Sequence, residues 1–295
     1  MQSFFNYNTL NVSLVRSTRT IFVKLNRAKS NHSINMETLF ELESLFAWLS
    51  NKVEIHSVFI SSEDSKEDNK NLFSAGYNLK NLNKYNHNQI QKLTEKLSHL
   101  VHAMQNLPQT FVCDLREGVS NIGCELAIGA DIRIADESCQ IEFNHNKVGL
   151  TPSSSGMSTL ALMVGQFHAR NILLTGKAIT TDTAKNSGFL FETYTPSSRA
   201  ASIQDLLSNI HAQAPVQRIQ TKLGIFDIER VNYEQSIKIE KQISKASMMS
   251  EDWKKAKVLI EEEKVIKDDF MPAKSMSYAT KLTLVKPEEN QEPTH

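Results

Sequence analysis

Hydrophobic positions change their spacing several times along the first part of the chain, and each change predicts a new element. The alternating, β-branched runs LNVSLV and TIFVKL flank the polar RSTR and predict a β-hairpin that ends near Asn26. Beyond Asn35, apolar residues recur at helical spacing and predict an amphipathic helix. These residues are Met36, Leu39, Leu42, Leu45, Phe46 and Leu49.

The alternation of strands and helices continues to about residue 195. SVFISS predicts a buried strand, residues 89–107 a helix, and TFVCDL the next strand. The turn at residues 118–123 is followed by a predicted helix over 125–130 and by the strands IRIAD and CQIEFN. This order of elements is typical of an α/β fold.

The last third of the chain is helical and charged. RAASIQDLLSNIHAQ, PVQRIQTKLGIF, EQSIKIEKQISKASMM and EDWKKAKVLIEEEKVIKDDF predict successive helices, and KPEENQEPTH a frayed tail. We therefore expect a core over residues 1–197, a helical region over 198–285 and a flexible tail over 286–295. The EEEK and KDD clusters are expected on a solvated helix face.

Composition excludes several classes of function. Lys plus Arg and Asp plus Glu each total 33, so no overall field favours nucleic acid or an anionic membrane. No stretch approaches the roughly 20 apolar residues that span a bilayer, and we expect no export signal. Cys113, Cys124 and Cys139 lack the spacing of a zinc site, so we expect free thiols in a cytoplasmic protein.

Four strings carry the functional signal: LNRAKSNHSIN, FSAGYNLKNL, GCELAIGADIRIA and LTGKAITTDTAKNSGFL. Together they resemble the motifs of the crotonase (enoyl-CoA hydratase/isomerase) superfamily over about residues 10–270. The resemblance implies an α/β fold with a crotonase-like ββα spiral core and a C-terminal helical trimerisation region. It also implies acyl-CoA substrates and a homotrimer or dimer of trimers. No permanently bound cofactor and no metal are implied, since coenzyme A enters as part of the substrate.

The resemblance implies an oxyanion hole made of two backbone N–H groups, which stabilise negative charge on the thioester oxygen. By the motif match the first donor is the N–H of Ala75, unless Ala75 and Gly76 form a simple tight turn. An ungapped match makes Ile122 the second donor, whereas a one-residue deletion would make it Gly123. A β-branched residue such as Ile122 resists positive φ, so the two alternatives stay open.

Two glutamates do the proton transfers in the family, and Glu125 matches the first. The ungapped match puts Asn144 on the family's proline and His145 on the second glutamate. His145 is either a proton carrier, since an unperturbed imidazole has a pKa near ~6.5, or a polar structural residue. Glu142 is a candidate displaced carboxylate, although in a regular strand it would face away from position 145.

The substrate's coenzyme A is expected to contact residues around these motifs. Asn78 stands where the family commonly has aspartate. Lys80, which matches a family lysine, and the basic pair Arg27 and Lys29 of the first motif are expected near the phosphates of the coenzyme, and Ala75 is a further expected contact. The alternative is that the basic residues are solvated surface side chains. The serines of PSSSG, residues 152–156, either hydrogen-bond a polar acyl tail or form a turn.

Three functions remain open. The first is an acyl-CoA lyase or isomerase in which Glu125 and His145 move protons around an enolate. The second is an acyl-CoA-binding or scaffolding protein whose chemistry has decayed, as the changes at Ile122, Asn144 and His145 suggest. The third is thioester hydrolysis with Glu125 as the base. The retained Glu125 and FSAG turn favour an enzyme.

Overall fold

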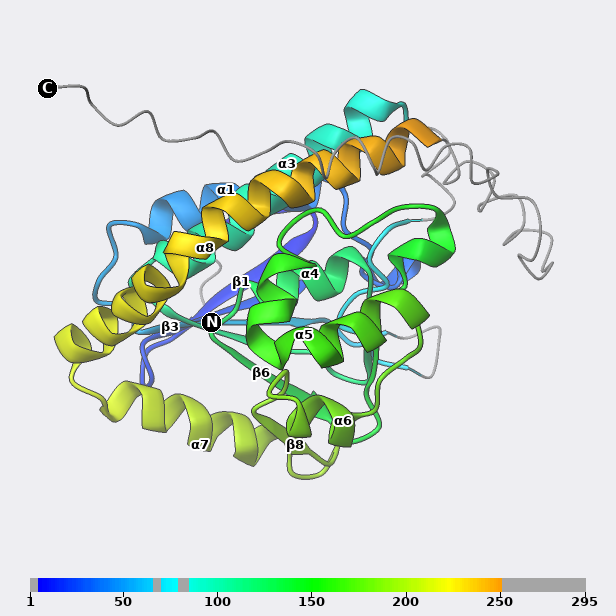
Figure 1. The fold of residues 1–295 in the computed structure, drawn as a ribbon. Coiled ribbons are helices and arrows are strands. Elements are labelled where there is room, and N and C mark those ends of the chain that lie inside the picture. The colour runs from blue at the N-terminus through cyan, green and yellow to red at the C-terminus, as the bar shows by residue number, and fades with distance from the viewer. Residues whose placement is uncertain (1–4, 66–69, 79–84, 251–295) are drawn as a thin grey trace, which may run out of the picture.

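A computed structural model describes residues 5–65, 70–78 and 85–250 (Figure 1). Its main sheet has six strands in the order β1-β2-β3-β4-β6-β8. The strands are β1 (Leu10–Val15), β2 (Thr20–Leu25), β3 (Ser57–Ser62), β4 (Thr110–Asp114), β6 (Ile132–Asp136) and β8 (Glu192–Tyr194). β1 and β2 pair antiparallel, as the predicted hairpin requires, and every later pair is parallel. Parallel neighbours need crossover connections, which the helices supply.

The helices begin and end largely where sequence signals place them. Asn35 caps α1 by accepting a hydrogen bond from the Thr38 N–H, and Asn86 and Gln89 form a capping box at α3. The helical segments are η1 (Ala28–Ser30), α1 (Met36–Leu49), α3 (His87–Asn106), α4 (Ile122–Ile128), η2 (His145–Val148), α5 (Ser158–Thr175), α6 (Thr181–Asn186), α7 (Arg199–Ala212) and α8 (Pro215–Ser250). No described helix has the length and apolar character needed to cross a membrane.

A second, two-stranded sheet brings distant segments together. β5 (Gly118–Ser120) and β7 (Gln140–Glu142) pair in parallel, and single bridges join Ser74 to Val119 and Ile34 to Tyr77. The loops after β2, after β3, after β5 and after β7 therefore lie side by side, as successive turns of a spiral. This arrangement confirms the expected fold and brings three of the four sequence motifs together.

Two predictions about helices were wrong. Helix α4 begins at Ile122, three residues before the predicted start, because Asn121 takes the turn into the helix with φ 36°. The predicted separate helices over 215–226 and 234–249 are one helix, α8, because the intervening DIERVNY contains neither glycine nor proline. The predicted helix from residue 251, with its EEEK and KDD clusters, and the predicted tail lie outside the described residues.

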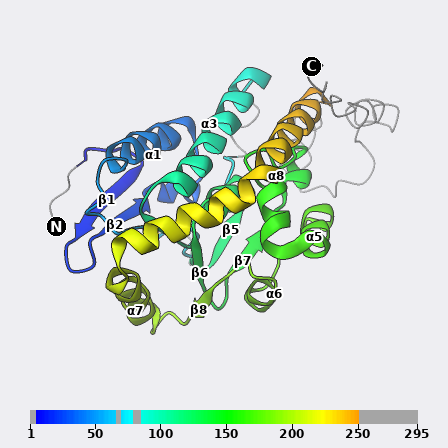
Figure 2. The ribbon, with the colours of Figure 1, turned by 60° about the vertical axis from the view of Figure 1, so that its left-hand side comes forward.

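Helix α8 is tied to the core by charged side chains, and it lies along α3 in both ribbon views (Figure 1 and Figure 2). Lys222 Nζ donates to the Met104 and Gln109 carbonyls, both at 2.7 Å, and pairs with Asp131 at 2.9 Å. Further along, the buried Glu240 accepts from the Ser158 N–H at 3.1 Å and the Ser158 Oγ at 2.7 Å. Glu240 thereby caps the start of α5.

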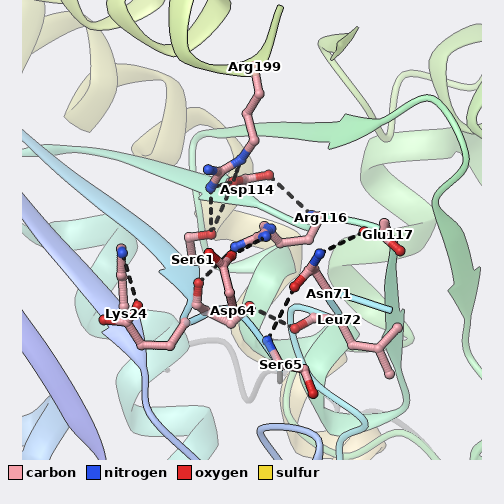
Figure 3. A network of polar contacts seen from close by, with 12 residues as sticks. Lys24, Ser61, Asp64, Ser65, Asn71, Leu72, Asp114, Arg116, Glu117 and Arg199 are labelled. Atoms are coloured by element: carbon pink, nitrogen blue, oxygen red, sulfur yellow. Dashed lines mark hydrogen bonds and ion pairs between the residues drawn. The ribbon is translucent and has the colours of Figure 1, made fainter. Parts of the chain in front are cut away.

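Helix α7 is anchored through the fully buried Asp114 at the end of β4 (Figure 3). Arg199 donates to Asp114 Oδ2 from Nε at 3.1 Å and from Nη2 at 2.6 Å. Ser61 Oγ, the Arg116 N–H and the Tyr194 hydroxyl donate to the same carboxylate. One carboxylate therefore connects β3, β4, β8 and α7.

We predict that Arg199→Met lowers the free energy of unfolding by about 3 kcal/mol, because it leaves Asp114 buried without its cation. Urea titration measures this loss. The matched control is Lys24→Met, since the Lys24–Glu63 ion pair is partly exposed and its loss should cost less than about 1 kcal/mol. Equal losses in the two variants would contradict the anchoring role of Asp114.

The free energy of unfolding should also depend on pH through the buried Glu240. Burial, and next the charge of Glu125, raise the pKa of Glu240 from 4.5 to about 7. Because the folded pKa lies above the unfolded one, the protonated side chain favours folding below about pH 4.5, and that contribution is lost as pH rises through about 7. This group should lower the free energy of unfolding by on the order of 3 kcal/mol across that range.

Glu240→Gln should remove this pH-dependent contribution to the free energy of unfolding. Urea titrations at a series of pH values measure it. The exposed Glu192 provides the control, since Glu192→Gln should keep the wild-type pH dependence. If Glu240→Gln also keeps it, Glu240 does not titrate as its burial requires.

Candidate active site

The Glu125 carboxylate lies in the first turn of α4 and has no exposed surface. His145 Nε2 lies 2.8 Å from its Oε1, and the backbone N–H groups of Ser153, at 2.9 Å, and Ser154 donate to its Oε2. An ionised carboxylate only accepts hydrogen bonds, so in the pair with an ionised Glu125 the donor is His145 Nε2–H. The structure thus joins Glu125 and His145, the candidate acid/base residues, into one buried dyad.

A short helical turn that ends at a glycine carries the chain from His145 to Ser153, and a second glycine follows at position 156. His145 opens η2, which ends at Gly149 in the left-handed conformation, with φ 68°. Gly156 is required by space, because a Cβ there would lie 3.0 Å from both Cγ and Oε2 of Glu125 and 2.6 Å from the Pro152 Cβ. The backbone of residues 152–156 therefore wraps directly over the carboxylate.

The same loop is held at its other end by Glu240, which accepts from the N–H groups of Met157 and Ser158. Two buried carboxylates from distant helices therefore fix successive residues of one loop. The serine hydroxyls of PSSSG make different contacts: Ser154 Oγ donates to the Thr94 carbonyl, and Ser153 Oγ has no partner among the described residues. Thus the PSSSG backbone, rather than its hydroxyls, binds Glu125.

The predicted pair of oxyanion donors, Ala75 with Ile122 or Gly123, is not the pair of N–H groups that meets at one oxygen. The Ala75 N–H donates to the Asn31 carbonyl at 2.9 Å. The two N–H groups that meet at one oxygen belong to Tyr77, at 2.8 Å, and Ile122, at 2.9 Å, and that oxygen is Asn121 Oδ1. Ile122 lies within the helix, and the positive φ of the turn falls on Asn121.

Gly123, the alternative donor, has a packing role. It lies one residue further into α4, where a Cβ would lie 3.0 Å from the Ser74 Cβ and 3.1 Å from the Val119 Cγ2. Its missing side chain thus lets the FSAG segment approach the helix closely.

The sequence reasoning did not single out Asn121. Its amide Nδ2 donates to Asn144 Oδ1 at 3.2 Å, and Asn144 Nδ2 donates to Glu142 Oε2 at 2.7 Å. Gly76 makes room for the carboxamide, since a Cβ there would lie 1.7 Å from Asn121 Oδ1. The available signal was an asparagine in a glycine-rich turn, because asparagine tolerates positive φ better than most residues.

The phenol of Tyr77 adds to the electrostatics of this site. Burial, and next the charge of Glu125, raise the pKa of Tyr77 well above its usual value of 10.0. Its hydroxyl therefore stays protonated near the carboxylate. Within the described part of the chain, no group of three or more His, Cys, Asp and Glu side chains is placed to hold a metal ion.

The proposed contacts to coenzyme A lie in neighbouring segments. Arg27, at the start of η1, is half-buried, and Lys29, within η1, is exposed. Asn78 is the next residue after Tyr77 in the FSAG segment. The chain after η1 touches the FSAG turn, since the Ile34 N–H donates to the Gly76 carbonyl at 2.8 Å. Lys80 lies outside the described residues. A cavity of about 180 Å³ lies between α3 and α8, with Ser153 in its wall.

Known proteins resemble this chain in sequence and in fold. The model of the enoyl-CoA hydratase/isomerase family matches residues 16–265. The chain is 24% identical over 206 residues to the short-chain-enoyl-CoA hydratase of Clostridium acetobutylicum, covering 70% of this chain and 77% of that protein. It is 23% identical to the crotonyl-CoA hydratase of Syntrophomonas wolfei, covering 68% and 75%.

Solved structures agree on the fold. An enoyl-CoA hydratase from Mycobacterium avium subsp. paratuberculosis superposes with a TM-score of 0.77 at 18% identity, covering 88% of this chain and 98% of the other. An enoyl-CoA hydratase from Bacillus halodurans gives 0.76 at 18% identity, covering 85% and 99%. With a family model matched over most of its length, the chain belongs to the enoyl-CoA hydratase/isomerase family.

Proposed function

We propose that the protein is an acyl-CoA thioester-processing enzyme of the hydratase/isomerase type, with Glu125 as its acid/base group. The observation that carries this proposal is the dyad of Glu125 and His145, joined at 2.8 Å and shielded from solvent. A buried carboxylate held in place by an imidazole is a suitable group for proton transfer at a carbon atom.

In this mechanism Glu125 moves a proton to or from the carbon next to the thioester carbonyl. The negative charge that develops on the oxygen is stabilised by backbone N–H groups, among which we propose that of Ile122. One carboxylate suffices for isomerase or hydrolase chemistry. Hydration needs a second group to deliver or take a proton, and His145 is our candidate because its Nε2 lies 2.8 Å from Glu125 Oε1.

The binding half of the proposal places coenzyme A along the FSAG turn, with Arg27, Lys29 and Asn78 near its polar groups. Coenzyme A would enter only as part of the substrate. We further propose a cytoplasmic location, which the three free, buried cysteines support.

A second candidate function is acyl-CoA binding without turnover. One observation favours it: the two convergent N–H groups are already hydrogen-bonded to Asn121 Oδ1. In addition, Glu125 already accepts three hydrogen bonds from the protein. A site whose donors and base are satisfied internally would bind a thioester without activating it.

We predict that the protein turns over at least one of crotonyl-, decanoyl- and acetyl-CoA, and that Glu125→Gln lowers the rate by at least about 100-fold. Glutamine keeps the shape of the side chain and removes the base. Mass spectrometry of the thioester after incubation measures the rate, and the exposed Glu137 provides the control variant, Glu137→Gln, with wild-type rate.

His145→Ala separates the roles of the dyad. If His145 carries a proton, this variant should lose one limb of the pH–rate profile and bind thioester almost unchanged. If rate and profile persist, His145 is structural and Glu125 works alone. Calorimetric binding without turnover would establish the second candidate function, and no saturable heat with any of the thioesters would reject both.

We also propose a homotrimer or a dimer of trimers. Helix α8 supports this with apolar side chains that a monomer leaves exposed. They are Val216, Ile225, Ile228, Ile239, Ile243 and Met249.

Light scattering should therefore give a mass of roughly 100 kDa or twice that, since one chain is 33.3 kDa. Ile228→Glu, at a side chain 81% exposed, should lower the mass. Val53→Glu, at a residue 61% exposed in the turn between α1 and β3, should leave it unchanged. A monomeric wild type at micromolar concentration would contradict the assembly.

A further inference from the structure

We propose that Asn121 is a latch on the substrate site: its carboxamide oxygen occupies the place of the thioester oxygen and must leave before a thioester can bind there. This inference rests on the proposed acyl-CoA function of the same site. It concerns a position where this chain departs from the family pattern: residues 121–127 read NIGCELA, where the matching motif of the resembled family reads GGGCELA.

The hydrogen bonds of the Asn121 carboxamide identify its oxygen and its nitrogen. The Tyr77 and Ile122 N–H groups both point at one atom, at 2.8 and 2.9 Å, so that atom must be the acceptor Oδ1. Two rigid backbone donors that meet at one oxygen are the geometry of an oxyanion hole. In this structure the protein supplies the oxygen itself.

The backbone at Asn121 supports a specific role. Its φ of 36° is a conformation that side chains rarely adopt, and glycine would adopt it more readily. The side chain is buried and fills the space that Gly76 leaves open. An asparagine kept in this conformation is held there by what its carboxamide binds.

The other end of the carboxamide is held by two further residues. Asn121 Nδ2 donates to Asn144 at 3.2 Å, and Asn144 donates to Glu142 at 2.7 Å. Asn144 replaces the family's proline, and a proline side chain has no group to accept from Asn121. The substitutions at 121 and 144 therefore form one hydrogen-bonded chain that ends at a half-buried carboxylate.

The latch should act more strongly on substrate binding than on the reaction that follows. A neutral thioester oxygen accepts hydrogen bonds from the two N–H groups about as strongly as the neutral amide oxygen of Asn121 does. Replacing the amide oxygen by the thioester oxygen therefore gains little free energy. An enolate oxygen is charged, and charge-assisted hydrogen bonds are stronger than neutral ones. The latch would thus weaken binding of any thioester while leaving the charged intermediate able to displace it.

The test compares thioester and free coenzyme A. Asn121→Gly should bind decanoyl-CoA or acetyl-CoA about tenfold more tightly than wild type, as measured by calorimetry. It should bind free coenzyme A, which has no acyl carbonyl, with unchanged affinity. The carbonyl stretch of a ¹³C-labelled bound thioester should shift to lower frequency in this variant, because two donors become available to it.

Further variants separate the latch from relief of backbone strain. Arg19→Gly also removes a side chain at positive φ, 49°, but lies in the exposed β1–β2 turn; it should bind thioesters as wild type does. Asn121→Asp keeps the shape and adds charge, so it should hold the donors and weaken thioester binding. Asn144→Ala removes the hydrogen-bond acceptor of Asn121 Nδ2 and should give part of the gain in thioester affinity. This variant tests the latch without changing the turn at Asn121.

Equal thioester affinity in wild type, Asn121→Gly and Asn144→Ala would overturn the latch, as would an equal gain for free coenzyme A. In either case a wild type that binds and converts thioesters leaves the proposed function standing. If no variant binds any thioester although Asn121→Gly is folded, the proposed function fails, and the latch fails with it.

Discussion

Burial of the Glu125 carboxylate is the constraint on which the site depends. A charged group with no exposed surface must be matched by donors, because leaving it unpaired would cost several kcal/mol. The protein meets this need with His145 and with the backbone of Ser153 and Ser154. The turn at Gly149 and the small residue at 156 follow from it, since they allow the chain to return over the carboxylate.

The same constraint couples the site to the C-terminal helix. Glu240 of α8 binds the loop three residues beyond the point where Glu125 releases it. Burial, and next the negative charge of Glu125, disfavour ionisation of Glu240 and raise its pKa. Any change that draws α8 away from α5 would therefore release the backbone that lies over Glu125. The helical region is thus part of the environment of the dyad as well as a candidate surface for assembly.

Sequence patterns predicted the local elements well, because their causes are local. The α1 cap at Asn35 and the buried stripe that follows it lie within one helix. The contacts that define the site join residues far apart in the chain, such as Ser158 and Glu240, 82 residues apart. Neither periodicity nor a motif reports such a contact. The family strings identified Glu125 and His145 as partners in chemistry, but their hydrogen bond depends on the path of the loop between them.

Asn121 shows why the turn before α4 was the hardest part to predict. Matching strings treats a replaced glycine as the loss of a flexible position, whereas the structure shows a gained acceptor at that position. Whether this chain acts as an enzyme or a binder therefore depends on a competition between oxygens for two N–H groups. An internal amide has the advantage of being tethered, so it wins over weakly bound neutral ligands. A developing enolate has the advantage of charge. The chemistry of the family can persist here if the second advantage exceeds the first.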